Sequence, residues 1–412
     1  MKTNWQTKKL GEICEIKGGK RVPRGYKLKN EATNYPYIRV ADFNDYGSVD
    51  LGDMRYIDKN IYEQIKRYTI STKDLYISIA GTIGKTGIIP QELEGANLTE
   101  NACKLVFNKN IYNKYIYYFT QTDEFIIQTE LNTRKVAMPK LALTRLGNIL
   151  IPIPESLDEQ RRIVAVLDEV FLATATAKEN AEKNLKNSRA LFESYLQSIF
   201  SGKNDEWEEK KLGDKNLFQI IDGDRGKNYP NKSDFSPEGY CLFLNTKNVR
   251  PDGFDFQTTM FVTEKKDKAL GNGKLQRNDV LLTTRGTIGN IAVYDETVPF
   301  ENIRINSGML IFRPNIKVIL PEYLFSIFQS GIMKTQIKKY VSGAAQPQLP
   351  IKTLVNFSIP VSKSLPEQKA IVARLDSLSG ETKKLEEIYR QKIADVDELK
   401  KSVLKKAFSG EL

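Results

Sequence analysis

The chain has 412 residues, enough for two or three domains with cores of their own, and its 40% of apolar residues argue against general disorder. Its formal net charge of +11 favours a polyanionic partner, and the absence of histidine removes the commonest side chain for proton transfer and metal binding. Three widely spaced cysteines, with no apolar run of membrane-helix or signal-peptide type, predict a cytoplasmic protein.

The main organising feature is an internal repeat of about 205 residues. Residues 5–11, with the sequence WQTKKLG, recur at 207–213 as WEEKKLG. The Gly-Thr-Ile-Gly motif of residues 81–84 recurs at 286–289. The spacing drifts only slightly, as small loop insertions would cause, so the sequence predicts one unit that is used twice.

The first part of each copy, residues 1–155 and 204–362, is predicted to be a mixed α/β domain. Short runs rich in strand-forming residues, such as 75–79, are separated by turns that contain glycine or asparagine. A helix is predicted to follow the strands in each copy, over 114–131 and, from a proline start, over 321–340.

The second part of each copy, residues 156–203 and 363–412, is predicted to be one long spacer helix. Each opens with Leu-x-Glu-Gln, closes with Phe-Ser-Gly, and carries apolar residues at steps of three and four or their multiples. The expected seam is Ile163, Leu167, Val170, Ala177, Ala181, Leu185, Phe192, Leu196 and Ile199, with Ile371, Leu375, Leu378, Leu385, Tyr389, Val396, Leu399 and Val403. The simplest arrangement is a coiled coil between the two helices; the alternative is that each packs on its own domain.

Two short motifs invite an enzymatic interpretation, and both are incomplete. The Gly-Lys-Thr of 84–86 resembles the end of a phosphate-binding loop, but Ile79 stands where that loop needs its first glycine. Gly-Thr-Ile-Gly is therefore predicted to be a tight turn after a buried strand. The Pro-Asp of 251–252 with the Glu-Lys-Lys of 264–266 resembles a metal-dependent nuclease motif, which the first copy lacks. No catalytic, cofactor-binding or metal-binding residue is predicted.

Candidate DNA-contacting residues are basic or amide side chains in loops and at strand ends. Residues 17–29 carry several lysines and arginines and no acidic residue, and Arg39 and Asn245 take matching places at strand ends. Basic side chains can neutralise phosphates, arginine can grip guanine, and amides can pair with adenine or equally cap turns. The predicted set is Lys17, Lys20, Arg21, Arg24, Arg39, Arg134, Lys135, Arg225, Lys227, Asn245, Lys247, Arg285, Gln346 and Gln348.

A duplicated α/β domain, each copy followed by a long helix with these end motifs, resembles the DNA-specificity subunits of type I restriction-modification systems. The Trp-x-x-Lys-Lys-Leu-Gly opening and the Gly-Thr-Ile-Gly motif are similar to that family as well, and the likeness covers essentially the whole chain. The resemblance implies two target-recognition domains that act in the major groove. It also implies that the two helices pair antiparallel, as a spacer and a docking surface.

The resemblance further implies a non-catalytic chain whose partners are double-stranded DNA, two methyltransferase subunits and restriction (motor-nuclease) subunits. S-adenosylmethionine would belong to the methyltransferase, ATP and magnesium to the restriction subunit, and no cofactor to this chain. Presumed contact residues differ between the copies, as Lys20 against Asp224 and Arg39 against Asn245, so two different half-sites are expected. The alternatives are a coiled-coil adaptor that binds protein, and a cryptic nuclease or methyltransferase.

Overall fold

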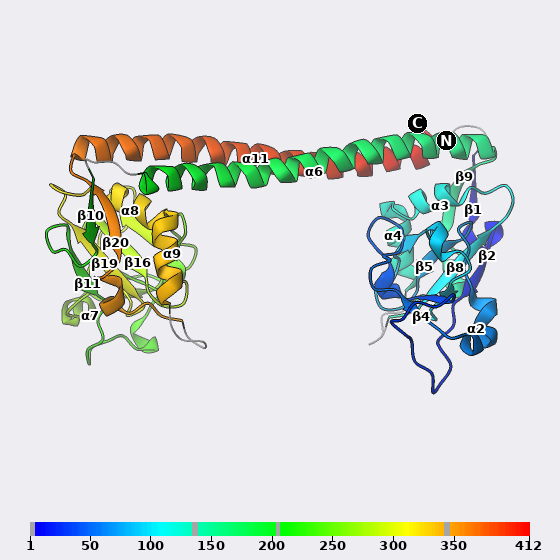
Figure 1. Ribbon diagram of the computed structural model, residues 1–412, viewed down its shortest axis with the longest axis horizontal. Helices are drawn as coiled ribbons and strands as arrows, with labels where there is room; N and C mark the ends of the chain where they lie inside the picture. Colours follow the sequence, from blue (N-terminus) through cyan, green and yellow to red (C-terminus); the bar gives the residue numbers. More distant parts are fainter. Residues whose placement is uncertain (1–4, 134–138, 203–206, 342–346) are drawn as a thin grey trace. The chain divides into compact units, whose positions relative to one another are not determined.

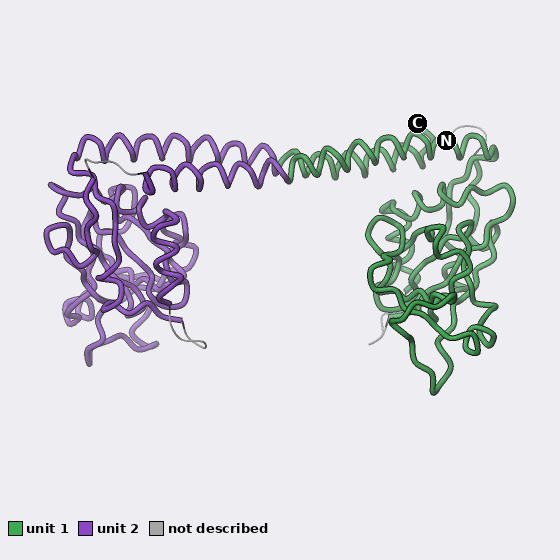
Figure 2. The backbone as a smooth tube through the Cα atoms, viewed as in Figure 1, with its two compact units in different colours: residues 1–182, 391–412 green, residues 183–390 purple. Residues whose placement is uncertain are grey.

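The computed structural model describes residues 5–133, 139–202, 207–341 and 347–412. The chain forms two compact units (Figure 2): unit 1 combines residues 1–182 with 391–412, and unit 2 comprises residues 183–390. Each unit therefore contains one α/β domain and parts of both long helices (Figure 1). Among the described residues, no helix has the length and apolarity needed to span a membrane.

Unit 1 is built on a four-stranded antiparallel sheet in the order β2-β8-β5-β6. A second sheet places β3 between antiparallel β4 and parallel β7, and β1 pairs antiparallel with β9. The strands are β1 (Trp5–Lys9), β2 (Cys14–Gly18), β3 (Pro36–Ile38), β4 (Arg55–Tyr56), β5 (Leu75–Ser78), β6 (Thr86–Gly87), β7 (Asn97–Leu98), β8 (Ala102–Phe107) and β9 (Leu150–Pro154). The helices of this domain are α1 (Leu10–Ile13), α2 (Lys59–Ile65), α3 (Asn113–Phe119), α4 (Asp123–Asn132) and α5 (Leu143–Leu146).

Unit 2 repeats the three sheets of unit 1 and adds the antiparallel pair β13-β14. Its sheets have the orders β11-β19-β16-β17 and β15-β12-β18, with β10 paired to β20, so the repeat seen in the sequence is confirmed as a repeat of folds. The strands are β10 (Trp207–Lys211), β11 (Phe218–Asp222), β12 (Cys241–Leu244), β13 (Val249–Arg250), β14 (Gly253–Phe254), β15 (Phe261–Val262), β16 (Asp279–Thr283), β17 (Ile291–Tyr294), β18 (Ile303–Ile305), β19 (Met309–Pro314) and β20 (Ser358–Ser362). The helices are α7 (Glu264–Ala269), α8 (Pro321–Gln329), α9 (Gly331–Tyr340) and α10 (Ile351–Leu354).

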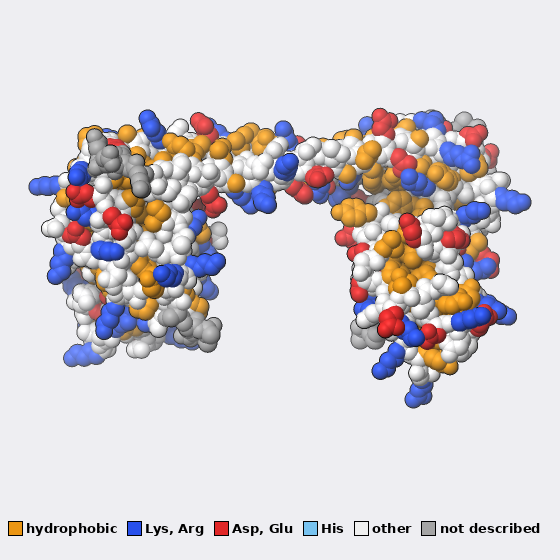
Figure 3. Space-filling model, in the orientation of Figure 1, with side chains coloured by type: hydrophobic (Ala, Val, Ile, Leu, Met, Phe, Trp, Pro, Cys, Tyr) orange, Lys and Arg blue, Asp and Glu red, His pale blue; other side chains and the backbone are white. Residues whose placement is uncertain are grey.

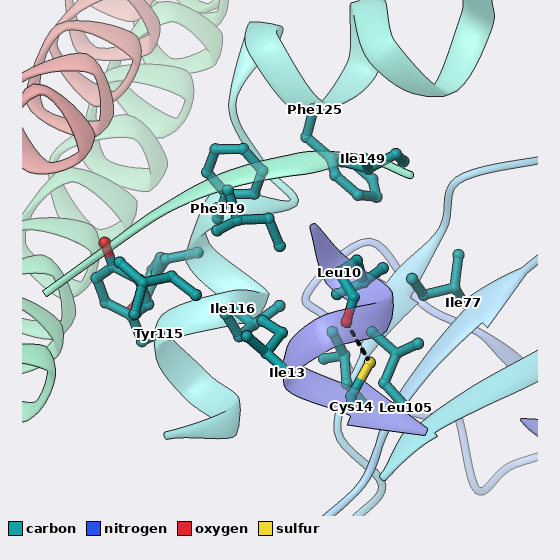
Figure 4. Packing of buried hydrophobic residues seen from close by; sticks show 14 of the residues in the cluster. Leu10, Ile13, Cys14, Ile77, Leu105, Tyr115, Ile116, Phe119, Phe125 and Ile149 are labelled. Atoms are coloured by element: carbon teal, nitrogen blue, oxygen red, sulfur yellow. Dashed lines mark hydrogen bonds between the residues drawn. The ribbon is translucent and has the colours of Figure 1, made fainter. Parts of the chain in front are cut away.

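The core of unit 1 lies between the four-stranded sheet and its helices. Leu10 and Ile13 of α1 meet Tyr115, Ile116 and Phe119 of α3 in one cluster, and all five side chains are at most 2% exposed (Figure 4). Burying a side chain of this size stabilises a fold by about 1.5–3 kcal/mol. The four-residue helix α1 is thus held in place by its two core side chains.

The predicted single helices over 114–131 and 321–340 are wrong, because each region forms two helices. In unit 1 the Thr122 hydroxyl accepts a hydrogen bond from the Phe125 main-chain N–H at 3.2 Å and caps the start of α4. In unit 2 Ser330 takes an extended backbone conformation between α8 and α9. Threonine and serine favour such N-cap positions, and they end the preceding helix there.

The two long helices are α6 (Leu157–Ser201) and α11 (Leu365–Ser409), each of 45 residues. In both units the two helices run antiparallel and are joined by ion pairs. The prediction of a coiled coil is therefore confirmed, and the alternative, in which each helix packs only on its own domain, is wrong. Three expected seam residues are misplaced, since Ala177 is exposed and Leu385 and Leu399 are 38% and 48% exposed. Thr174 and Thr382, which the apolar pattern passed over, are buried, and their hydroxyls bond main-chain carbonyls one turn earlier.

The glutamine of the Leu-x-Glu-Gln motif anchors each long helix to its domain. Gln160 is fully buried, and its amide nitrogen donates to the carbonyls of Asn110 and Pro154 at 3.1 and 3.2 Å. Its amide oxygen accepts from the N–H of Tyr112 at 2.9 Å. Gln368 makes the same three bonds in unit 2, each at 2.9 Å. Glutamine is required because only its amide both donates twice and accepts at this reach.

Replacing Gln368 with leucine should lower the free energy of unfolding of unit 2 by about 2 kcal/mol, because three buried main-chain groups lose their partners. Chemical denaturation in a Trp5→Phe background would measure this, since Trp207 then reports on unit 2 alone. Lys369→Ala, on the exposed neighbouring residue, is the matched control. Equal denaturation midpoints for the two variants would show that the anchor contributes nothing.

Candidate nucleic-acid interface

In each unit, the predicted contact residues that the structure describes concentrate where two parallel strands end. In unit 1, Ile38 of β3 lies opposite Leu98 of β7, so Arg39 and the turn that starts at Thr99 leave the sheet side by side. Unit 2 has the same arrangement, with Leu244 of β12 opposite Ile305 of β18. Loops on a rigid strand edge are the usual place for binding residues.

Two glycines bring a second loop onto this edge. A Cβ atom on Gly19, which follows β2, would lie 2.0 Å from the Thr99 carbonyl oxygen, and one on Gly223 would lie 2.2 Å from that of Asn306. No other residue fits such an approach. The residues after each glycine, Lys20 in unit 1 and Asp224 in unit 2, are thereby fixed beside the turn that follows the parallel strand.

In unit 1 these loops carry Lys20, Arg21 and Arg39. Lys20 is exposed, with its ammonium 5.8 Å from the centroid of the Tyr68 ring. The Arg21 Nε donates to the Glu100 carboxylate at 2.5 Å, although most of the Arg21 side chain stays in solvent. Burial acts to raise the pKa of Glu100, but the hydrogen bond from Arg21 helps to hold this pKa below its ordinary value, so the Glu100 carboxylate is ionised at neutral pH.

Arg39 is held by acidic neighbours within its own loop. Its guanidinium donates to the buried Asp42 carboxylate at 2.5–3.1 Å and to Asp53 at 3.3 Å. The hydrogen bond with Asp42 raises the pKa of Arg39 above its usual value. A quarter of the side chain is exposed, so Arg39 presents a fixed rather than a freely moving cation.

The predicted basic stretch 17–29 begins at the end of strand β2, and the rest of it lies in the loop that follows. Lys17 lies on β2 and pairs with Glu15 at 2.7 Å, which the sequence pattern did not foresee. Arg24 and Lys27 lie in the loop after β2, are exposed, and have no ion pair among the described residues. Within unit 1 this loop extends away from α6, and lysine and arginine side chains occupy its tip (Figures 1 and 3).

In unit 2 an acidic side chain, Asp224, holds the loop after β11, whereas the equivalent residue in unit 1 is the basic Lys20. The buried Asp224 carboxylate accepts main-chain N–H groups of Gly226 and Gly271, both at 2.6 Å. Burial opposes ionisation, but these bonds keep the pKa of Asp224 below its ordinary value. Arg225 then donates to Asp222 and to the Ser307 carbonyl, both at 3.2 Å, and Lys227 is exposed.

Asn245 and Arg39 hold equivalent positions, as predicted, and both start a short 3-10 turn: Thr246–Asn248 after Asn245 and Val40–Asp42 after Arg39. The Asn245 side-chain oxygen accepts from the Lys247 N–H at 2.8 Å, so it caps the turn. Lys247 itself is exposed.

Arg285 and Gln348 lie opposite each other in an isolated β-bridge, and both are exposed. The Arg285 N–H also donates to the Gly308 carbonyl at 3.2 Å, which joins this pair to the turn contacted by Arg225. Because Thr287 also donates to the Thr246 carbonyl, four loops of unit 2 meet at one edge, and they carry Arg225, Lys247, Arg285 and Gln348.

Three predicted residues, Arg134, Lys135 and Gln346, lie outside the described residues and stay predictions. One basic residue was missed: Lys140 is exposed and bridges Ala80 in unit 1 as Gln348 bridges Arg285 in unit 2. Aligning the repeats at Pro139 and Pro347 would have identified it.

The Gly-Thr-Ile-Gly motif is a tight turn, as predicted. Both glycines of each copy have positive φ angles, 74° and 89° at Gly81 and Gly84, and the Ser78 hydroxyl accepts the Lys85 N–H at 2.8 Å. The Lys85 ammonium pairs with Asp45 at 2.8 Å. These partners explain the motif without a bound phosphate.

Two residues of the nuclease-like motif are engaged in ion pairs. Glu264 pairs with Lys268 at 2.8 Å, and Lys266 pairs with Asp234 at 3.0 Å. Within the described ranges, no group of three or more His, Cys, Asp or Glu side chains is arranged to hold a metal ion.

Comparison with known proteins agrees with this architecture. The family model of the type I restriction modification DNA specificity domain matches residues 2–187 and 204–393. The type I restriction enzyme EcoBI specificity subunit of Escherichia coli is 24% identical, over 99% of this chain and 86% of that protein. The MjaVIII specificity subunit of Methanocaldococcus jannaschii is 23% identical, over 99% and 93%.

Two solved structures share the fold. A chain from a study of the assembly and conformational transition of a type I restriction-modification system has a TM-score of 0.78 at 19% identity, covering 100% of this chain and 99% of that one. The HsdS subunit from Thermoanaerobacter tengcongensis has a TM-score of 0.64 at 19% identity, covering 100% and 98%. The double match of the family model, on two units of the same topology, shows that the chain belongs to the family of type I restriction-modification DNA-specificity proteins.

Proposed function

We propose that the chain selects the DNA site of a type I restriction-modification complex by binding one half-site with each unit. The observation that carries this proposal is that one strand-end edge is built twice with different exposed side chains. Unit 1 presents Lys20 and Arg21 there, whereas unit 2 presents Arg285 and Gln348. Equal scaffolds with unequal contact residues favour an asymmetric, two-part site.

The side-chain chemistry indicates how each half-site would be recognised. Arginine can donate two hydrogen bonds to guanine, and glutamine can pair with adenine, each worth about 1–3 kcal/mol of discrimination. Exposed cations that have no ion pair among the described residues, such as Arg24 and Lys27, suit phosphate contacts that carry no sequence information. Residues shared by the two units, such as Gly19 and Gly223, would position the loops.

The paired helices would be the docking surface for two methyltransferase subunits, with restriction subunits joining the complex for cleavage. Large apolar side chains that stay more than a third exposed on α6 and α11 support this; they are Leu172, Leu191, Leu385, Ile388 and Leu399. The methyltransferase would supply S-adenosylmethionine and flip the target adenine, and the restriction subunit would use ATP and magnesium. This chain would act in the cytoplasm, without a cofactor of its own.

Co-expression with a type I methyltransferase subunit, followed by base-resolved mapping of adenine methylation, tests the proposal. One two-part motif with a fixed gap is expected, absent without this chain. Arg285→Ala should relax selectivity at one position of one half by about tenfold and leave the other half unchanged. Arg21→Ala in unit 1 is the matched variant and should alter the other half. A stable complex without any methylation motif, or changes in both halves from one substitution, would contradict the two-edge mechanism.

A further inference from the structure

The two long helices carry opposite charges at equivalent positions of the repeat. Both have 45 residues, so they align end to end without a gap, with Leu-x-Glu-Gln at the start and Phe-Ser at the end. In this alignment Lys178 of α6 falls on Glu386 of α11, and Arg189 falls on Asp397. Helix α6 thus has two cations where α11 has two anions.

These four residues form two ion pairs, one inside each unit. In unit 1 the Lys178 ammonium lies 2.9 Å from both carboxylate oxygens of Asp397. In unit 2 the Arg189 Nε lies 3.1 Å from the Glu386 carboxylate. Because the repeat relates the two units, both ion pairs join the same two positions of the repeat. At these positions α6 carries the two positive charges and α11 carries the two negative charges.

This distribution has a consequence for pairing between copies. If α6 met α6 of a second chain in the same antiparallel register, Lys178 would face Arg189 and like charges would repel. If α11 met a second α11, Glu386 would face Asp397 with the same result. Only α6 against α11 gives attraction at both places, and charge pairs of this kind set partner choice between helices.

Several buried or partly buried positions of the helices cannot make this distinction, because the same residue stands there in both copies. The identical equivalents that are buried or partly buried are Gln160 and Gln368, Ile163 and Ile371, Val164 and Val372, Leu167 and Leu375, Thr174 and Thr382, Leu196 and Leu404, and Phe200 and Phe408. At these positions a helix paired with a second copy of itself would bury the same side chains. Discrimination must therefore come from positions where the copies differ.

We propose that the sign reversal at these positions directs α6 to α11 and prevents two copies of the chain from joining through like helices. A partly exposed ion pair changes a pairing equilibrium by only a few-fold. The effect is amplified here because every wrong pairing replaces two attractions by two repulsions. The charged positions of each long helix therefore favour one partner, which is the other long helix of the same chain.

The test exchanges the residues of one equivalent pair, as Arg189→Asp with Asp397→Arg, in the full-length chain. Composition and net charge are unchanged, but charges now match between like helices and clash between unlike ones. The ratio of dimer to monomer, measured by light scattering after size exclusion over a concentration series, should rise about tenfold over the unaltered chain. The rise should shrink in high salt, which screens exposed charges.

The matched control exchanges all charged equivalents in this region. Glu386 also bonds Arg390 at 2.6 Å, and Glu182 lies near Lys178 at the position equivalent to Arg390, so that pair is included. The control is Lys178→Glu, Glu182→Arg, Arg189→Asp, Glu386→Lys, Arg390→Glu and Asp397→Arg. This control has more substitutions than the test variant, but it restores attraction between α6 and α11. Its ratio of dimer to monomer should therefore equal that of the unaltered chain.

The outcomes separate the proposal from a general loss of stability. If the test variant fails to fold while the control folds, sign matching is still what the helices require, which supports the proposal. If the test variant is no more dimeric than the control, or if both variants dimerise or unfold alike, the charge pattern does not direct pairing and the proposal is wrong.

Discussion

Replacing Asp267 with asparagine is expected to lower the free energy of unfolding of unit 2 by about 3 kcal/mol, because it leaves a buried cation without its counter-charge. Asp267 is 2% exposed and Arg304 is 5% exposed. The Arg304 Nε donates to the Asp267 carboxylate at 2.5 Å, and Lys274 contacts its other oxygen, also at 2.5 Å. Denaturation followed by Trp207 fluorescence in a Trp5→Phe background measures the loss.

The control for this variant is Glu264→Gln on the same short helix, α7. Glu264 also forms an ion pair, with Lys268, but both side chains are more than half exposed, so solvent already screens their charges. Its denaturation midpoint should stay at the unaltered value. If Asp267→Asn were as stable as this control, the buried cluster would not be holding β18 against α7.

The same pair gives unit 2 a defined response to acid. Burial acts to raise the pKa of Asp267, but Lys274 and Arg304 together hold it below its ordinary value. A carboxyl whose pKa is lower in the folded state contributes its stability above the unfolded-state pKa of about 3.9. That contribution is lost as the pH falls through the folded-state pKa. The unaltered unit 2 should therefore lose its advantage over Asp267→Asn below about pH 4.

Replacing Phe408 with alanine is expected to destabilise unit 1 by about 3 kcal/mol, although residue 408 belongs to the second copy of the repeat. Its ring lies 5.1 Å from that of Tyr115 and 5.2 Å from that of Phe119, centroid to centroid. A cavity would replace these contacts in the core of the first domain. Trp5 fluorescence in a Trp207→Phe background reports this change.

The equivalent substitution, Phe200→Ala, serves as the reciprocal control. The Phe200 ring lies 5.6 Å from that of Tyr323 in unit 2, so here a residue of the first copy supports the second domain. Each variant should shift the transition of the unit that its phenylalanine enters more than that of the other unit. Equal shifts of both transitions from either variant would count against this exchange of core residues.

The parts of the fold that the sequence predicted are those where one residue type has no substitute. Gln160 and Gln368 meet three main-chain groups each, and Gly19 and Gly223 touch a carbonyl oxygen, so both copies keep the same residue and the repeat is visible. The apolar steps along α6 and α11 likewise follow from helix geometry alone.

What the sequence did not predict depends on partners that are distant along the chain. Nothing near Arg21 indicates that Glu100 will bind it, and nothing near Asp224 indicates that Gly271 will donate to its carboxylate. The break at Thr122 was missed because threonine also occurs within helices. Side chains at the proposed DNA-contacting edge are set by such long-range contacts, and so their individual roles stay predictions.

The exchange of helix ends between the two copies also sets a time order for biosynthesis. Leu404, Ala407 and Phe408 are part of the core of unit 1, whose other members precede residue 168. A ribosome adds about 5–20 residues per second, so more than 200 further residues delay these side chains by roughly 10–40 seconds. During that interval the apolar side chains of the first domain that contact Leu404, Ala407 and Phe408 remain exposed. The last turns of α11 then bury these side chains, so the domain that is synthesised first is the last to complete its core.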